Sequence, residues 1–125
     1  MTVLADAKIK EQHDQNQRMI EDIDALTSKG QDRDKLTRML VLFIKRLRVH
    51  CENEERVMMM KGYKYLPSHK DDHARIFETL GLVVQVCNDK NMAVNNQMGK
   101  NIERLISEHI EMYDNQMMAY LEKVG

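Results

Sequence analysis

The chain has 125 residues, 42% of them apolar and 31% charged, a size that suits one domain spanning residues 1–125. Its 19 basic and 20 acidic residues give a net charge of −1, which argues against nucleic-acid or membrane-surface partners, and no apolar run reaches the roughly 18 residues of a membrane span. The N-terminal segment lacks the apolar core of a signal peptide and there are only two cysteines, so we expect a cytoplasmic protein with reduced thiols.

Three breaks divide the chain into four segments. Gly30 can stop a helix, and Asp32 can cap the next one. Pro67 biases the preceding residue away from helical backbone angles, and Ser68 is expected to cap the helix that follows. A weaker break lies near residues 88–91. The sequence predicts four helices over residues of about 11–27, 33–60, 69–88 and 93–122.

Each segment carries its apolar residues at alternating steps of three and four. In the second segment, for example, these steps collect Leu36, Leu40, Phe43 and Leu47. This spacing places the side chains on one stripe of a helix, and no strand-like alternation competes with it. Four such helices with short connections bury their stripes best in a bundle. We therefore predict an all-α fold, an antiparallel up-down-up-down four-helix bundle.

All five histidines of the chain fall on the predicted apolar stripes. Glu54 follows His50 by four residues, and His73 follows His69 by four, so each pair lies one turn apart on a single helix face. A single buried histidine is more often a hydrogen-bonded core residue than a ligand. Burying five imidazoles and a carboxylate costs free energy, however, and the chain offers few hydrogen-bond partners for them on these stripes. The pattern favours a metal site with the candidate ligands His13, His50, Glu54, His69, His73 and His109.

The number of candidate ligands indicates the kind of metal site. Five imidazoles and at least one carboxylate exceed what a single tetrahedral zinc ion binds. They suit two adjacent transition ions such as iron, with nitrogen and oxygen donors. The Glu-x-x-His pairs of ferritin-like di-iron proteins and the His-Glu-x-x-His motif of zinc proteases are both absent from the sequence.

Asp114 is a weak candidate on periodicity alone. It follows His109 by five residues, which is about 140° around an ideal α-helix rather than on the same stripe. Its position by itself indicates a solvated surface charge or a residue at a helix end, not a ligand.

The polar residues on the stripes also form an ordered pattern along the chain. The chain contains, in order, His13, His50-x-x-x-Glu54, His69-x-x-x-His73 and His109-x-x-x-x-Asp114. Gln12 precedes the first histidine, Glu55 follows Glu54, and Tyr65-Leu66-Pro67 leads into the third segment. In order, spacing and intervening lengths this pattern resembles the hemerythrin family over nearly the whole chain.

The resemblance implies a non-haem di-iron centre in the bundle core. Two iron ions would be joined by an oxo or hydroxo bridge and by two shared carboxylates. One iron would keep an open coordination position, which distinguishes a ligand-binding metal from a structural one, and dioxygen is the ligand that the family binds there. The implied ligands are His69, His73 and His109 on one iron, His13 and His50 on the other, and Glu54 and Asp114 as bridges.

Two residues depart from the family pattern beside the expected dioxygen site. Cys51 stands where the family commonly has Phe after the second histidine, and Asn16 stands where it usually has an apolar residue. Reversible dioxygen binding needs a dry, apolar pocket, so these two residues favour faster autoxidation. The alternative is that Cys51 packs as a small apolar side chain and Asn16 bonds to a backbone partner. The expected pocket-lining residues are Cys51, Asn16, Ile106 and Met58.

The resemblance implies reversible dioxygen binding, in an oxygen carrier, store or delivery protein that is not an enzyme. Besides a bundle that uses another metal only structurally, two alternatives remain open. One is an oxygen or redox sensor, which would act through a signalling partner. The other is a di-iron oxidoreductase that acts on peroxide or nitric oxide and needs an electron donor.

Overall fold

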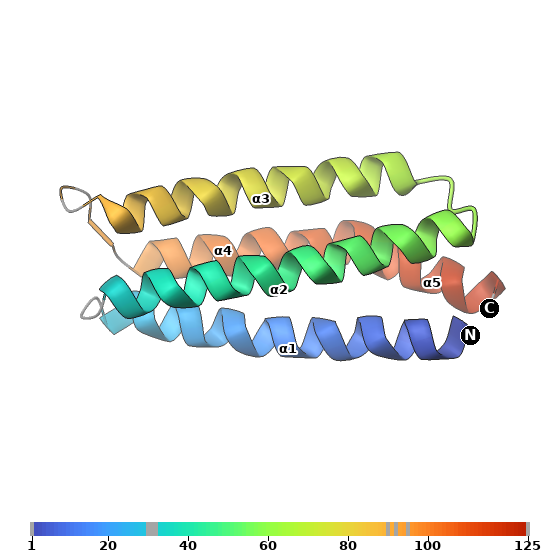
Figure 1. Cartoon of the computed structure of the whole chain (residues 1–125), viewed down its shortest axis with the longest axis horizontal. Coiled ribbons are helices and arrows are strands. Elements are labelled where there is room, and N and C mark those ends of the chain that lie inside the picture. The colour runs from blue at the N-terminus through green and yellow to red at the C-terminus, as the bar shows by residue number, and fades with distance from the viewer. Residues whose placement is uncertain (1, 30–32, 90, 92, 95, 125) are drawn as a thin grey trace.

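A computed structural model describes the backbone of residues 2–29, 33–89, 91, 93–94 and 96–124, and the side chains of residues 9–27, 33–89, 91, 93–94 and 97–124. Within these residues the ordered elements are all helical, which confirms the predicted fold class. The last three elements follow one another without a gap and form one continuous rod (Figure 1). The elements are α1 (Thr2–Lys29), α2 (Arg33–Met60), α3 (Leu66–Asn88), α4 (Asn96–His109), a π-helical turn (Ile110–Asp114) and α5 (Asn115–Val124).

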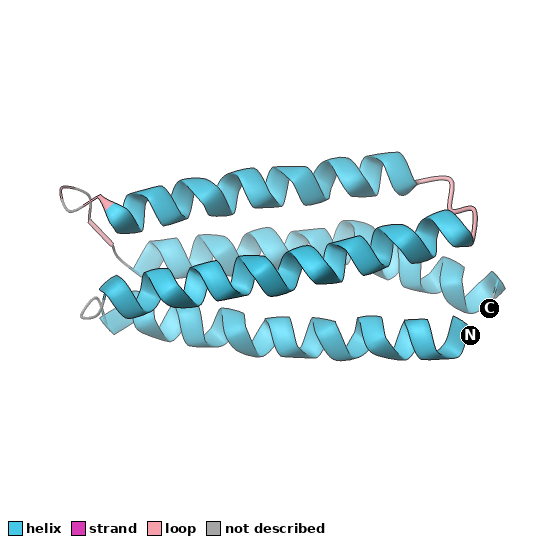
Figure 2. Cartoon of the chain, in the orientation of Figure 1, coloured by secondary structure: helices cyan, strands magenta, loops and turns pink. Residues whose placement is uncertain are grey.

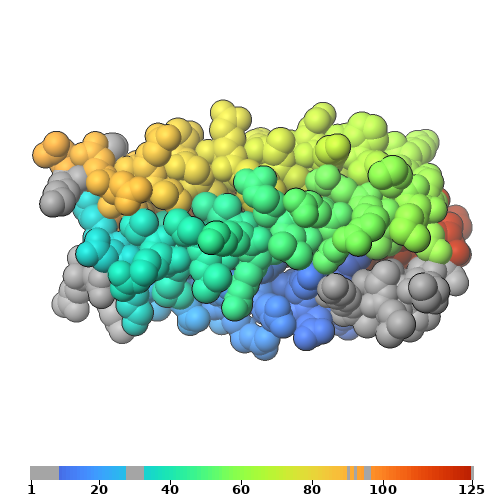
Figure 3. Space-filling view, in the orientation of Figure 1, coloured from blue at the N-terminus to red at the C-terminus, as the bar shows by residue number. Residues whose placement is uncertain are grey.

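The four rods lie side by side and alternate in direction along the bundle (Figure 1). α1 packs against α2 and α4, and α3 packs against α2 and α4. Short connections join consecutive helices at the two ends of the bundle, as the colouring by secondary structure shows (Figure 2). In the space-filling view, α2 crosses the middle of the visible face between α3 and α1 (Figure 3).

The helix starts differ from the prediction in three places, and one of them is α4, which begins at Asn96 rather than near residue 93. α1 begins at Thr2 rather than near residue 11, and the break predicted at Gly30 and Asp32 lies outside the described residues. α3 begins at Leu66, with Pro67 in its first turn. Proline is tolerated there because the backbone N–H groups of the first turn have no hydrogen-bond partner within the helix. The prediction that Ser68 caps α3 is therefore wrong, because Ser68 lies inside the helix and its hydroxyl donates to the Tyr65 carbonyl at 3.1 Å.

The bundle core consists of two apolar clusters. The larger cluster is centred on fully buried residues such as Phe43, Leu40 and Leu80, and draws on all four rods. The smaller cluster lies near the end where the chain begins and ends, and comprises Ile9, Met58, Tyr63, Met117 and Leu121.

A layer of buried polar side chains lies between the two apolar clusters. Along α2, for example, Glu54 lies between Cys51 of the larger cluster and Met58 of the smaller one. Along the fourth rod, His109 and Asp114 lie between Ile106 and Met117 in the same way. The apolar clusters on both sides therefore hold the polar layer at a fixed height in the bundle and limit its contact with water. Among the described helices, none combines the length and the apolar character needed to cross a membrane.

Candidate metal centre

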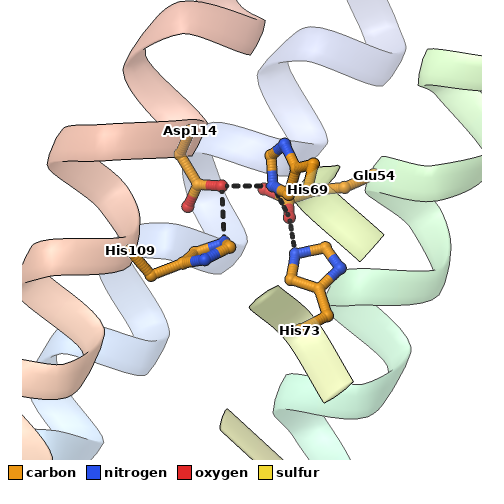
Figure 4. A group of neighbouring side chains, drawn as sticks. All are labelled: Glu54, His69, His73, His109 and Asp114. Atoms are coloured by element: carbon orange, nitrogen blue, oxygen red, sulfur yellow. Dashed lines mark hydrogen bonds and ion pairs between the residues drawn. The ribbon is translucent and has the colours of Figure 1, made fainter. Parts of the chain in front are cut away.

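Seven side chains from all four rods converge in the polar layer. Figure 4 shows five of them: Glu54 of α2, the two histidines of α3, and His109 and Asp114 of the fourth rod. Six of the seven are buried, whereas the side chain of the seventh, His13, is 19% exposed. The converging residues are His13 from α1, His50 and Glu54 from α2, His69 and His73 from α3, and His109 and Asp114 from the fourth rod.

The π-helical turn explains how Asp114 reaches this layer. The N–H of Asn115 bonds to the carbonyl of Ile110, five residues earlier, so this turn contains about one residue more than an α-helical turn. The extra residue returns Asp114 to the face that carries His109, and the Asp114 side chain is only 3% exposed. The interpretation of Asp114 as a solvated surface charge is therefore wrong, because the helix is not an ideal α-helix at this point.

The Glu54 carboxylate faces histidines on both of its sides. Its Oε2 lies 3.0 Å from Nε2 of His13 and 3.2 Å from Nε2 of His50. Its Oε1 lies 3.0 Å from Nε2 of His73 and 3.7 Å from Nε2 of His69. Each oxygen of this one carboxylate thus serves a different pair of imidazoles.

The two oxygens of the Asp114 carboxylate also contact different imidazoles. Its Oδ1 lies 2.9 Å from Nε2 of His69 and 3.0 Å from Nε2 of His109, the two contacts drawn at Asp114 in Figure 4. Its Oδ2 lies 3.1 Å from Nε2 of His13. Both carboxylates therefore lie between the same two sets of imidazoles.

The donor atoms form two groups that share both carboxylates. Within each group the donor atoms all lie within 4.8 Å of one another. One group has three imidazoles and the other has two, so the second group offers one nitrogen donor fewer. The groups are Glu54, His69, His73, His109 and Asp114, and His13, His50, Glu54 and Asp114.

Several of these donor atoms lack a hydrogen-bond partner. Nε2 of His50, His69 and His109 and Oδ1 of Asp114 are buried, and within the described part of the chain their close contacts with one another and with Glu54 lack hydrogen-bond geometry. Each such atom costs on the order of 1–3 kcal/mol when it is left unsatisfied in the protein interior. Cations bound between the carboxylates and the imidazoles would satisfy all of them, and nitrogen and oxygen donors in these numbers suit mid-series transition ions. The residues present therefore fit two such cations.

In three imidazoles the Nδ1 atom, which faces away from the site, is hydrogen-bonded to a side-chain oxygen. Nδ1 of His50 lies 2.8 Å from Oε1 of Gln12, and Nδ1 of His73 lies 2.8 Å from Oε2 of Glu55. Nδ1 of His109 lies 2.6 Å from Oδ2 of Asp72. When each Nδ1–H donates to its acceptor, the lone pair of Nε2 is directed into the site, as a metal ligand requires.

Asp72 is the functional residue that the sequence analysis missed. It precedes the candidate ligand His73 and is buried, but its partner His109 lies 37 residues away on another helix. Periodicity places residues on the faces of a single helix and does not say which helices are neighbours. Gln12 and Glu55, by contrast, stand next to candidate ligands and belong to the pattern found in the sequence.

The electrostatics of the metal-free site favour bound protons. Burial lowers the pKa of His13, but hydrogen bonds to Asp114 and Glu54 outweigh burial and raise this pKa to about 10. The same opposing effects raise the pKa of His69 to about 9. Burial raises the pKa values of Glu54 and Asp114, but the imidazoles in close contact with these carboxylates hold both pKa values below their usual range. Metal ions that bind here would therefore displace protons.

A small cavity of about 20 Å³ adjoins the site. About 10–15 Å³ is enough for one water molecule, so the cavity admits a very small ligand. Of the four residues expected to line a pocket, Asn16 and Ile106 line this cavity, and Cys51 and Met58 do not. The cavity is lined by His13, Asn16, Gln17, Leu47, His50, Glu54, Ile76, Ile106, His109, Ile110 and Asp114.

The positions of Cys51 and Met58 explain why they do not line the cavity. Cys51 is buried in the larger apolar cluster, so it packs as a small apolar side chain, and Met58 belongs to the smaller cluster. Met58 lies one turn beyond Glu54, whereas the cavity extends from Glu54 the other way along α2, toward His50 and Leu47.

The family model described as Hemerythrin HHE cation binding domain matches residues 4–121 of the chain. This match spans all four rods and includes all seven converging side chains. No curated protein and no solved structure matches the chain closely enough to indicate a relative.

Proposed function

The chain belongs to the hemerythrin family, and from this premise we propose that its buried site holds two iron ions and binds dioxygen reversibly. In this proposal the protein is an oxygen carrier, store or delivery protein. When bound, two ferrous ions would supply an open coordination position and two electrons to dioxygen. The residues of the chain hold the ions, orient the ligands and exclude water.

The proposal rests on one observation: the two donor groups differ in their number of imidazoles, and the group with fewer imidazoles adjoins the cavity. His13 and His50 form the group with one nitrogen donor fewer, and both line the cavity, whereas only His109 of the other three histidines does. The free coordination position of the second ion would therefore face a space of about 20 Å³. That space suits a ligand of a few atoms and excludes an organic substrate.

The apolar walls of the cavity support reversible binding rather than turnover. The cavity side chains that are neither donor residues nor amides are apolar: Leu47, Ile76, Ile106 and Ile110. Apolar walls limit the water and protons that would convert the bound ligand into other products. Reduction of peroxide or nitric oxide would also require an electron donor at each turnover. For these reasons we propose a binding protein and not an enzyme.

We also propose a cytoplasmic location. Cys51 and Cys87 are both buried and form no disulfide. Buried, unpaired thiols are typical of proteins in a reducing compartment.

The experiment that tests the proposal is anaerobic loading with ferrous iron, followed by oxygen and then by degassing. We expect two irons per chain by metal analysis, and a visible ligand-to-iron charge-transfer band that appears with oxygen and disappears on degassing. A different metal content would contradict the di-iron site. Direct and irreversible oxidation would contradict reversible binding and favour the sensor or the oxidoreductase.

A matched pair of variants in the π-helical turn tests whether Asp114 belongs to the iron site. Asp114→Asn removes the charge of a shared carboxylate, and we expect it to lower the iron content and abolish the reversible band. Glu111→Gln removes a charge from an exposed residue of the same turn, and we expect both measurements to stay as in the wild type.

A further inference from the structure

A second hollow lies on the surface next to the cavity, at the seam between α1 and α2. This groove is lined by Gln12, Gln15 and Asn16 of α1 and by Lys45, Arg46 and Val49 of α2. The face seen in Figure 3 includes the boundary between these two helices. Asn16 lines both the groove and the inner cavity, so this one side chain lies between solvent and the site.

Among the seven converging side chains, the one contributed by α1 is the most accessible to solvent. The side chain of His13 is 19% exposed, whereas the other six converging side chains are at most 6% exposed. Asn16 follows His13 by one helical turn and therefore lies over the same part of the site. Because Asn16 lines both the cavity and the groove, the way from the groove to the cavity passes this side chain.

The side-chain amide of Asn16 has hydrogen-bonding capacity that the described residues do not use. Asn16 is only 5% exposed, and its Nδ2 is buried without a hydrogen-bond partner in the described part of the chain. An NH₂ group of an amide only donates hydrogen bonds. It is therefore suited to a small ligand with exposed lone pairs.

The charges at the groove favour a negative ligand. Lys45 and Arg46 line the groove and are both exposed, and no carboxylate lines it. Two carboxylates of α1, Glu11 and Asp14, stand next to groove residues in the sequence without lining the groove, and Glu11 accepts a hydrogen bond from Gln15 at 3.4 Å. Cationic side chains at the mouth of a hollow raise the local concentration of anions and their rate of association.

We infer that the groove between α1 and α2 is the path by which small inorganic monoanions reach the metal centre. Lys45 and Arg46 attract the anion, and the Asn16 amide separates the groove from the cavity and donates a hydrogen bond to the anion once it is inside. This inference rests on the proposed function, because the anion would bind at the free coordination position.

The rate of azide binding to the oxidised, iron-loaded protein tests the role of the two cations. The double variant Lys45→Gln/Arg46→Gln is compared with the wild type and with Lys100→Gln, an exposed lysine of α4 outside the groove. At low ionic strength we expect association about threefold or more slower in the double variant only, with an unchanged dissociation rate. The difference should disappear at about 1 M salt, where charges are screened within about 3 Å. Nitric oxide, which is neutral, should bind the ferrous form of all three proteins at one rate.

A second readout tests Asn16 without iron chemistry. In the zinc-loaded protein, which undergoes no redox reaction, azide titration should shift the side-chain NH₂ resonances of Asn16 in nuclear magnetic resonance spectra. The NH₂ resonances of Asn101, on the exposed face of α4, serve as the control and should not move. Asn16→Leu should lower the azide affinity of the iron-loaded protein about tenfold, because the loss of one hydrogen bond to a charged group has that effect.

The possible failures are distinguishable. If the double variant binds azide as fast as the wild type at low salt, the groove is not the path. If azide binds and the Asn16 resonances stay in place, Asn16 is not the donor. If the iron-loaded wild type binds neither azide nor nitric oxide, there is no free coordination position, and the proposed function is overturned together with the path.

Discussion

The contact between Asp72 and His109 provides the sharpest test of how the site is built. Asp72 accepts a hydrogen bond from Nδ1 of His109 at 2.6 Å, and it is also paired with Nε of Arg75 at 2.9 Å. The Arg75 side chain is 53% exposed, so that ion pair contributes at most about 1 kcal/mol. The contact with His109 is buried on both sides and holds the imidazole in the orientation that a metal ligand needs.

Asp72→Ala should therefore weaken metal binding without removing a ligand. Loss of such a partner lowers metal affinity by about 10- to 100-fold, which corresponds to about 1.4–2.7 kcal/mol. Asp72→Asn keeps an acceptor oxygen but loses the charge, and neutral hydrogen bonds are about half as strong as charge-assisted ones, so its effect should be smaller. The assay is competition for ferrous iron against a chelator under anaerobic conditions.

Two control variants separate the possible causes. Asp71→Ala removes the neighbouring exposed carboxylate, and Arg75→Ala removes the other partner of Asp72. Both should bind iron with an affinity close to that of the wild type. If Asp72→Ala and Asp71→Ala have the same affinity, the argument that Asp72 orients His109 is refuted.

Three further predictions concern the metal-free protein. Gly99→Ala should lower the free energy of unfolding in urea by about 1–2 kcal/mol, because the new Cβ would lie 2.9 Å from Cα of Asp24 and overpacking outweighs the helix propensity gained. Gly81→Ala has open space around the new Cβ and should raise the free energy of unfolding by about 0.5–1 kcal/mol. If both substitutions change the free energy of unfolding in the same direction, this packing argument is contradicted. The raised pKa values of His13 and His69 stabilise the folded state fully below about pH 6.5, and this contribution should be lost as the pH rises through about 9 and 10, which urea unfolding at several pH values measures. Because metal ions displace these protons, loading at pH 7 in weak buffer should acidify the solution, and a pH electrode that records no proton release would show that the site was unprotonated.

The sequence predicted those features that depend on one helix at a time. The steps of three and four placed His50 with Glu54 and His69 with His73 on inward faces, and the structure buries all four. Asp114 was beyond this reasoning because the π-helical turn changes the period of the helix, and only the resemblance to a family pointed to it. A local irregularity of one residue leaves no clear signal in the pattern of apolar side chains.

Contacts between helices were predicted less well. The partnership of Asp72 with His109 depends on which rods are neighbours and at what height, and the lining of the cavity depends on the same information. Met58 lies on the correct face of α2 but one turn too far along it, in the apolar cluster beyond the site. Periodicity specifies the direction of a side chain around its helix and not its height relative to other helices.

The position of the polar layer along the bundle affects how the molecule comes apart. α1 begins and α5 ends at the same end of the bundle (Figure 1), and His13 near one terminus contacts Asp114 near the other at 3.1 Å. Metal ions bound by these two residues would cross-link the first and last helices. Without these ions, the described residues that keep the two chain ends together are the small cluster around Ile9 and Leu121 and the direct contact between His13 and Asp114, so local opening should begin there. Metal loss and the fraying of both termini are then a single event.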